Sequence, residues 1–259
     1  MSTKEVDWLA LRERQDHKSR SAELAKQFAR RVTPNSTVVD LACGTGSNVR
    51  FLRPMLSKDC RWLCIDNDSA ALAKAKSILP GSNIEFMQLD LANQMSSLTP
   101  DCSAAITVSA FLDMTSAGWL GQLTKLCRDK PLLATLSSDG RFEWDPVDSH
   151  DEAIRQQLVS FQCSDKGFGP ALGPYAARYL AEQLQHTGHQ VTLSPSDWRL
   201  EPMDAGTITF MVESIAKRIC TMNTDIPIDD WLATRKHQVE SGELNLTVGH
   251  VDLLALPQR

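Results

Sequence analysis

Three acidic residues end apolar stretches of this chain, and a glycine-rich turn follows the first of them. Asp40 ends VVD, Asp66 ends CRWLCID and Asp90 ends NIEFMQLD. In the turn LACGTGSN, Gly44 and Gly46 let backbone N–H groups approach a ligand closely. A carboxylate at the turn suits a cationic amine, and a carboxylate after the next strand can accept both hydroxyls of a ribose. The pattern therefore predicts a site for a nucleoside that carries an amine.

The elements that must position these residues alternate between apolar runs and segments of helical period. Such alternation is typical of repeated βα units on a parallel sheet covered on both faces. Asp68 and Ser116 are expected to be the N-caps of two of the helices. The predicted strands of the repeated units are residues 36–42, 60–66, 83–90, 104–110 and 131–137.

The remaining segments are less regular, and we predict one domain over residues 1–259. Residues 1–32 are expected to be a helical segment. Residues 138–174, which mix glycine, proline, aromatic and charged residues, are predicted to form a lid over an acceptor. Residues 201–242 are expected to be a helical insertion before the last strand, 244–257. Another strand is expected around 189–195.

Two local devices are predicted in these segments. Ser149 and Glu152 have the spacing of a capping box, which would start a helix inside the predicted lid. In the last strand the apolar phase changes at Gly249, which indicates a β-bulge.

Composition excludes several classes of protein. The 27 Lys and Arg against 32 Asp and Glu give a formal charge of -5, which is a poor match to nucleic acid. No apolar stretch is long enough to span a bilayer and no signal peptide is evident, so we expect no membrane association and a cytoplasmic location. The seven cysteines form no CxxC pair, so neither disulfides nor a metal site is predicted.

The motif of Asp40, Ala42, Gly44 and Gly46 resembles that of the class I S-adenosylmethionine-dependent methyltransferases, which reads D-x-G-x-G-x-G after an apolar strand. Ala42 replaces the first glycine, and the resemblance covers residues 34–137. It implies an α/β fold with a doubly wound, mostly parallel seven-stranded sheet, Rossmann-like, whose last strand is antiparallel. It also implies S-adenosylmethionine as the cofactor.

By the same resemblance, Asp40 and the turn hold the amino-acid part of the cofactor, and Arg20 closes on its carboxylate. Asp66 takes the ribose, while Asp90 and Leu91 take the adenine. The full predicted cofactor set is Arg20, Asp40, Ala42, Cys43, Gly44, Gly46, Asn48, Asp66, Asn67, Asp90, Leu91, Ser109 and Ala110.

The acceptor is predicted to be a small molecule. The fourth strand ends in SAFLDM and lacks both the Pro-Pro motif of amino-methylating nucleic-acid enzymes and the Pro-Cys nucleophile of cytosine-ring enzymes. We expect transfer to oxygen ahead of nitrogen. The candidate bases are Asp113, Glu143 and His150, although Asp113 would equally cap the helix near Ser116 and His150 would equally face solvent.

The predicted substrate-binding residues are Phe111, Arg141, Trp144, Lys166 and Tyr175. If two of Arg141, Lys166 and Tyr175 face inward, the acceptor carries a carboxylate or phosphate.

Two alternatives remain open from the sequence. One is a non-catalytic scaffold subunit that binds the cofactor, in which Phe111, Trp144 or Phe168 would leave no room for an acceptor. The other is a nicotinamide-dependent oxidoreductase, which Val49 disfavours because it occupies the place of the third glycine of the dinucleotide motif. The oligomeric state is not predicted.

Overall fold

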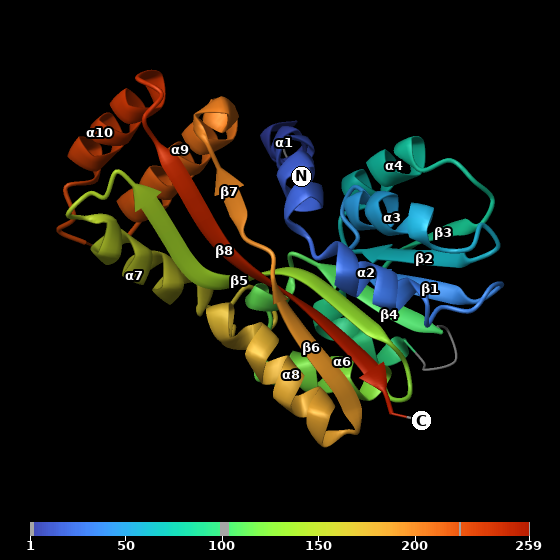
Figure 1. The fold of residues 1–259 in the computed structure, drawn as a ribbon. Coiled ribbons are helices and arrows are strands. Elements are labelled where there is room, and N and C mark those ends of the chain that lie inside the picture. Colours follow the sequence, from blue (N-terminus) through green and yellow to red (C-terminus); the bar gives the residue numbers. More distant parts are fainter. Residues whose placement is uncertain (1–2, 99–103, 223, 259) are drawn as a thin grey trace.

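The structure of the protein, a computed structural model, describes residues 3–98, 104–222 and 224–258. One sheet of eight strands runs through it in the order β3-β2-β1-β4-β5-β8-β6, with β7 paired to β8 (Figure 1). The strands are β1 (Thr37–Leu41), β2 (Arg61–Asp66), β3 (Ile84–Gln88), β4 (Ala105–Ser109), β5 (Leu132–Asp145), β6 (His189–Pro195), β7 (Trp198–Leu200) and β8 (Asn245–Pro257).

Strands β1 to β5 are parallel, and β8 pairs antiparallel with β5, β6 and β7. The helices are α1 (Thr3–Ser19), α2 (Ala22–Ala29), α3 (Ser47–Leu52), α4 (Ser69–Ile78), α5 (Leu91–Gln94), α6 (Ala117–Leu126), α7 (Asp151–Gln162), α8 (Ala176–His186), α9 (Ala205–Cys220) and α10 (Ile228–Glu240). The predicted α/β class, with a mostly parallel sheet and an antiparallel last strand, is confirmed. The short strand β7 was not predicted.

Strands β1, β2 and β4 and the first half of β5 are buried on both faces, which is why they are apolar runs and not alternating patterns. Along β1, Val38 packs in the cluster that contains residues of α2, α3 and α4, and Val39 packs in the cluster that contains residues of α6 and α8. The predicted helix starts are confirmed here, since Asp68 accepts hydrogen bonds at the start of α4 and Ser116 does so at the start of α6.

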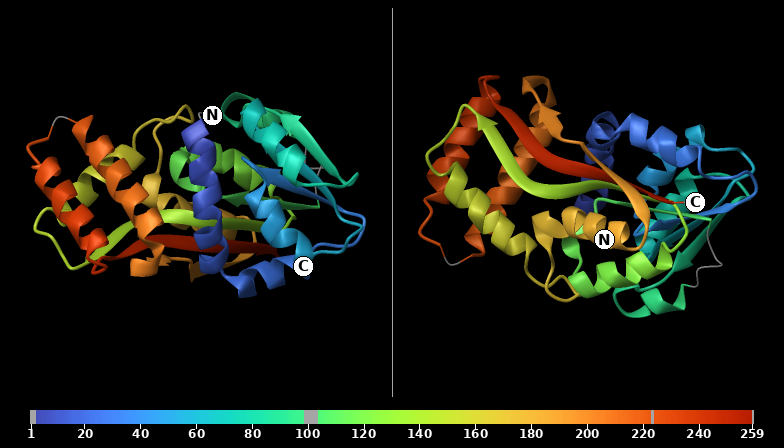
Figure 2. Two further views of the ribbon diagram at one scale, coloured as in Figure 1. Left: turned by 90° about the horizontal axis from the view of Figure 1, so that it is seen from above. Right: turned by 60° about the horizontal axis from the view of Figure 1, so that its bottom comes forward.

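The long strands β5 and β8 continue past the parallel strands and carry a third core cluster. This cluster joins β7, α7, α9 and α10 to the extended part of the sheet, around Trp144, Trp198 and Trp231. Figures 1 and 2 show α1 standing between this group of helices and the group formed by α3 and α4.

Several local predictions were wrong. The first eight residues assigned to the lid belong to β5, which continues to Asp145. The capping box does not form, because α7 begins at Asp151 after His150, and the Glu152 side chain pairs with Arg155. The initial helix also breaks in two, with Ser21 capping α2.

The irregularity predicted at Gly249 lies in the partner strand. The register between β5 and β8 shifts because β5 carries the extra residues, first around Leu136 and then between Ser138 and Phe142. Gly249 faces the second of these, and a Cβ added to it would lie 2.0 Å from Asp139 Oδ1. Glycine is thus required in β8 by close approach of the bulged strand.

No helix of the described residues has the length and apolar character needed to cross a membrane.

Candidate functional site

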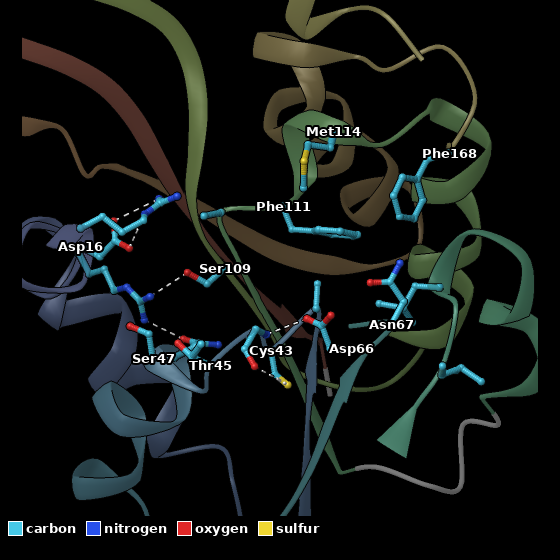
Figure 3. A pocket seen from close by; sticks show the side chains of 18 residues that line it. Asp16, Cys43, Thr45, Ser47, Asp66, Asn67, Ser109, Phe111, Met114 and Phe168 are labelled. Atoms are coloured by element: carbon cyan, nitrogen blue, oxygen red, sulfur yellow. Dashed lines mark hydrogen bonds and ion pairs between the residues drawn. The ribbon is translucent and has the colours of Figure 1, made fainter. Parts of the chain in front are cut away.

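A cavity of about 360 Å³ lies where β1, β2 and β4 end, and we call it the main cavity. Open α/β sheets bind ligands at this edge of the sheet. Most of the predicted cofactor residues line it, and Figure 3 shows Asp16 on one side and Phe168 on the other. The lining residues are Arg12, Asp16, Arg20, Ala42, Cys43, Gly44, Thr45, Ser47, Asn48, Asp66, Asn67, Leu89, Leu91, Ser109, Ala110, Phe111, Met114 and Phe168.

The glycine-rich turn has the left-handed backbone that its glycines predict. Gly46 has φ +82° and is the N-cap residue of α3. A Cβ on Gly46 would lie 2.5 Å from Leu79 Cδ1. Gly44 has φ +52°. Ala42 has the same φ, and because its Cβ is crowded in this conformation, it is strained where a glycine would not be. Only Gly46 of these three lies outside the cavity lining, so its role is to turn the chain into α3.

Asp66 ties the turn to β2. Its Oδ2 accepts a hydrogen bond of 2.7 Å from the Gly44 N–H, and its Oδ1 accepts one of 2.9 Å from the Asp68 N–H. The carboxylate therefore sits in the cavity beside the turn, with the neighbouring Asn67 also lining it.

Asp40 does not reach the main cavity, which corrects the direct contact predicted for it. Its side chain is fully buried, and Oδ1 accepts a hydrogen bond of 2.6 Å from Asn48 Nδ2. Its Oδ2 is buried without a hydrogen-bond partner in the described structure. Burial raises the pKa of Asp40 to about 7, against the opposing effects of Asn48 and Arg20. Asn48 is the residue that faces the cavity.

Arg20 lies in the cavity wall, near the position predicted for a carboxylate clamp. It is buried, with Nη1 donating to Asn48 Oδ1 and Nη2 donating to Ser109 Oγ, both at 2.8 Å. These bonds link the loop after α1 to α3 and β4. Asp16 and Arg12, one and two turns earlier in α1, form an ion pair of 3.0 Å beside it.

Asp90 is used differently from the prediction. Its carboxylate caps α5, accepting from the Ala92 N–H at 2.9 Å and from Asn93 Nδ2 at 2.7 Å. The hydrogen bond from Asn93 is the main reason that the pKa of Asp90 is lowered. Its apolar neighbours Leu89 and Leu91 line the cavity in its place.

The far end of the main cavity is aromatic. Phe111, Trp119 and Phe168 contact one another edge to face, with ring centroids 5.2 to 6.1 Å apart. Phe111 and Phe168 line the cavity together with Met114 (Figure 3). Phe168 comes from the segment predicted to be a lid.

A second cavity of about 180 Å³ borders the main one, since Arg12 and Ala110 line both. Asp113 lies here, partly buried, and burial raises its pKa. Two further polar residues, Gln162 and His250, face the same space. The lining residues are Trp8, Arg12, Ala110, Asp113, Leu136, Ser138, Phe142, Gln162, Trp198, Met211, Val248 and His250.

Two other candidate bases lie outside both cavities. Glu143 is exposed and lies 3.6 Å from Arg141, which itself donates to Asp139 and Asp197. These side chains border a polar surface pocket on the outside of β5, β7 and β8. His150 pairs with Asp148 at 3.0 Å.

Three predicted substrate residues are also absent from both linings. Trp144 is buried against Trp231 and Arg235. Lys166 donates to the Phe161 carbonyl oxygen, and Tyr175 is 64% exposed. The cationic cluster predicted from proximity in sequence therefore does not converge on either cavity.

Residues of α1 and β8 are the main omissions of the sequence analysis. Arg12 and Asp16 are four residues apart on a helix, a spacing that is also typical of a solvated charged face, and nothing local marks Trp8 or His250 as neighbours of the segment after β4. Within residues 3–98, 104–222 and 224–258 no cluster of three His, Cys, Asp or Glu side chains could hold a metal ion.

Comparison with known proteins identifies the chain's relatives. Residues 38–129 match the family model described as a methyltransferase domain. A proposed methyltransferase of Bacillus halodurans has 15% identity and a TM-score of 0.54, with 92% of this chain and 100% of that chain covered. A proposed methyltransferase of Haloferax volcanii, solved with the Trm112 activator, has 14% identity and a TM-score of 0.52, covering 97% and 94%.

Phosphoethanolamine N-methyltransferase 2 of Haemonchus contortus, solved with S-adenosyl-L-methionine, has 13% identity and a TM-score of 0.51. The alignment covers 91% of this chain and 52% of that one. At these identities the likeness establishes the fold. No curated protein sequence matches the chain.

Proposed function

We propose that this chain, whose residues 38–129 match a methyltransferase domain, is a class I S-adenosylmethionine-dependent methyltransferase and transfers a methyl group from that cofactor to a small molecule. The observation that carries the proposal is the adjacency of two cavities near the ends of the parallel strands, with Arg12 and Ala110 lining both. One has the residues to hold the methyl donor, and the other has room for an acceptor.

The residues of the main cavity fit the cofactor's chemistry. The Asp66 carboxylate suits the ribose hydroxyls, and the aromatic and aliphatic end around Phe111 and Leu91 suits a flat base. Asn48 Oδ1 at the cavity wall is the side-chain oxygen offered to an ammonium group, and the Asp40 carboxylate lies buried behind Asn48. Arg20 supplies a cation for the carboxylate of the same amino-acid part.

When bound, S-adenosylmethionine supplies an electrophilic methyl group on a positively charged sulfur. The chain's own task is then alignment of the acceptor, and proximity of this kind supplies about 7–11 kcal/mol. Asp113 in the second cavity is placed to take the proton that an acceptor hydroxyl loses as its oxygen bonds to the methyl carbon. A nitrogen acceptor would release its proton to the same carboxylate, and we favour oxygen.

The two alternatives are less well supported. A scaffold without an acceptor site would have its aromatic residues closed over the methyl group, whereas the second cavity leaves about 180 Å³ beside the main one. A dinucleotide enzyme is disfavoured by Val49, a fully buried residue of α3 that stands where the dinucleotide motif has a glycine.

Calorimetric titration with S-adenosylmethionine and with NAD tests the proposal. We expect the first to bind and the second not to. Asp66→Asn should weaken the binding by about tenfold or more, since it removes a charged hydrogen-bond acceptor. Asp59→Asn, at an exposed position between β1 and β2, is the matched control and should bind normally.

Incubation with a metabolite pool and a methyl-labelled cofactor then identifies the acceptor. Tight binding of NAD, or the absence of S-adenosylmethionine binding, would refute the proposed function.

A further inference from the structure

The second cavity has apolar walls and a small set of polar atoms. Trp8, Phe142 and Trp198 supply aromatic surface, and Leu136, Met211 and Val248 supply aliphatic surface. About 180 Å³ is enough for one ring with a short substituent, and too little for a nucleotide or a long lipid. The polar atoms therefore decide which small molecules fit.

His250 presents a hydrogen-bond acceptor. Its Nδ1 lies 3.1 Å from the Val248 carbonyl oxygen, which can only accept, so Nδ1 carries the proton. Nε2 is then unprotonated, and it has no hydrogen-bond partner among the described residues. Burial lowers the pKa of His250 to about 4, with the Arg12 charge acting in the same direction, so the ring is neutral at physiological pH.

Gln162 presents a second acceptor. Its Nε2 donates to Ser138 Oγ at 3.0 Å, so the amide oxygen points away from Ser138. That oxygen, Oε1, is buried and has no partner in the described structure. Buried polar atoms without partners are rare in folded proteins, and a ligand that donates to them explains such an atom.

The charged groups around the cavity do not favour an anion. Asp113 provides a carboxylate whose pKa is raised by burial. Arg12 donates through Nε and Nη2 to Asp16, and its guanidinium lies over the rings of Trp8 and Trp198. The cation at this cavity is therefore already paired.

From these contacts we infer that the second cavity binds an uncharged or cationic small molecule through that molecule's own hydrogen-bond donors, and that Gln162 and His250 select it. The ligand class is a single-ring amine or alcohol. That this molecule is the methyl acceptor rests on the proposed function. An anionic acceptor would need Arg141, Lys166 or Tyr175 to face inward, and none of these side chains lines either cavity.

Three probes of one size test the inference: benzylamine, benzyl alcohol and benzoate, which are cationic, neutral and anionic at pH 7.5. Their binding to the full chain is measured by ligand-observed NMR, with and without S-adenosylhomocysteine. We expect the amine and the alcohol to bind at least about tenfold more tightly than benzoate. A preference of the amine over the alcohol would show that Asp113 contributes its charge. Benzoate binding equally or more tightly would overturn the inference.

Variants locate the binding. Gln162→Leu and His250→Leu should each weaken amine and alcohol binding about fivefold or more, with circular dichroism confirming the fold. Gln156→Leu, an exposed glutamine on the same helix α7, is the matched control and should bind as the parent does. Equal binding by Gln162→Leu and Gln156→Leu would overturn the inference.

The outcomes separate the inference from the proposed function. If the amine and the alcohol bind while S-adenosylhomocysteine does not, the proposed function fails and the inference stands. If S-adenosylhomocysteine binds and neither benzylamine nor benzyl alcohol does, the inference fails and the proposed function stands.

Discussion

Asn48 faces the main cavity and donates from Nδ2 to Asp40 Oδ1 at 2.6 Å, so the acidic residue of the first motif acts through an amide. The other side of that amide, Oδ1, accepts from Arg20 Nη1 at 2.8 Å. A buried carboxylate and a buried guanidinium are thus connected through one neutral side chain. This arrangement fixes the orientation of Asn48 at the cavity wall.

The buried Asp40 should make stability depend on pH. Its pKa in the folded protein is raised from 3.8 to about 7, so the unfolded chain loses this proton at lower pH than the folded one. The stabilisation is therefore complete below about pH 4 and is lost as the pH rises to about 7. Asp40→Asn keeps an oxygen for Asn48 and cannot ionise. We expect the melting temperature of Asp40→Asn to rise relative to that of the parent as the pH increases from 5 to 7. A difference in melting temperature that does not change with pH would contradict this.

The glycine turn predicts opposite effects of two substitutions. Gly46→Ala introduces a Cβ at φ +82° and 2.5 Å from Leu79 Cδ1, so it should cost more than about 1–2 kcal/mol and lower the melting temperature by several degrees. Ala42→Gly relieves a positive φ of +52° and should stabilise by up to about 1 kcal/mol. Gly44→Ala, with no atom within 4 Å of the added Cβ, is the control for strain without a clash. Equal losses for Gly44→Ala and Gly46→Ala would show that Leu79 simply moves aside.

Local devices of this fold could be predicted, since their partners are near in sequence. Asp68 and Ser116 cap helices two and three residues ahead, and the backbone of the glycine turn follows from its own residues. The ligand contact predicted for Asp90 was wrong for a related reason, because its carboxylate caps α5. A sequence pattern does not tell a cap from a ligand contact when both follow a strand.

The second cavity could not be predicted, because six α-helices and β-strands far apart in the chain build it. Trp8 comes from α1, Gln162 from the end of α7 and His250 from β8, and each reaches the cavity only because β5 and β8 extend beyond the parallel strands. The extension itself was missed, since residues 138–145 carry glycine and charges that are typical of a loop. Those residues form the bulged part of β5, where the pairing is irregular.

Asp113→Asn should slow methyl transfer without weakening cofactor binding. Asp113 lines the second cavity and not the main one, so the affinity for S-adenosylhomocysteine should be unchanged while the rate falls by about 10²- to 10⁴-fold. Because burial raises the pKa of Asp113, the rate of the parent should fall with decreasing pH at values above 3.8, as the carboxylate takes up a proton. That acid limb should vanish in the variant.

Glu143→Gln is the matched control for Asp113→Asn, as Glu143 is exposed outside both cavities. Its rate and pH profile should equal those of the parent. A loss of rate in Glu143→Gln, or an Asp113→Asn variant as fast as the parent, would remove Asp113 from the role of base.

The helices α7 and α10 should depend on one buried ion pair. Arg235 is fully buried, and its guanidinium bonds to both Asp151 oxygens at 2.5 Å and to the Pro146 carbonyl oxygen at 2.7 Å. Arg235→Met leaves the Asp151 charge without its partner, so we expect a loss of about 3–5 kcal/mol in urea unfolding. Lys236→Met, which breaks an exposed pair with Glu213, should cost less than about 1 kcal/mol. Since α7 ends at Gln162, partial unfolding of this region should weaken acceptor binding before cofactor binding, and equal losses of the two would contradict that order.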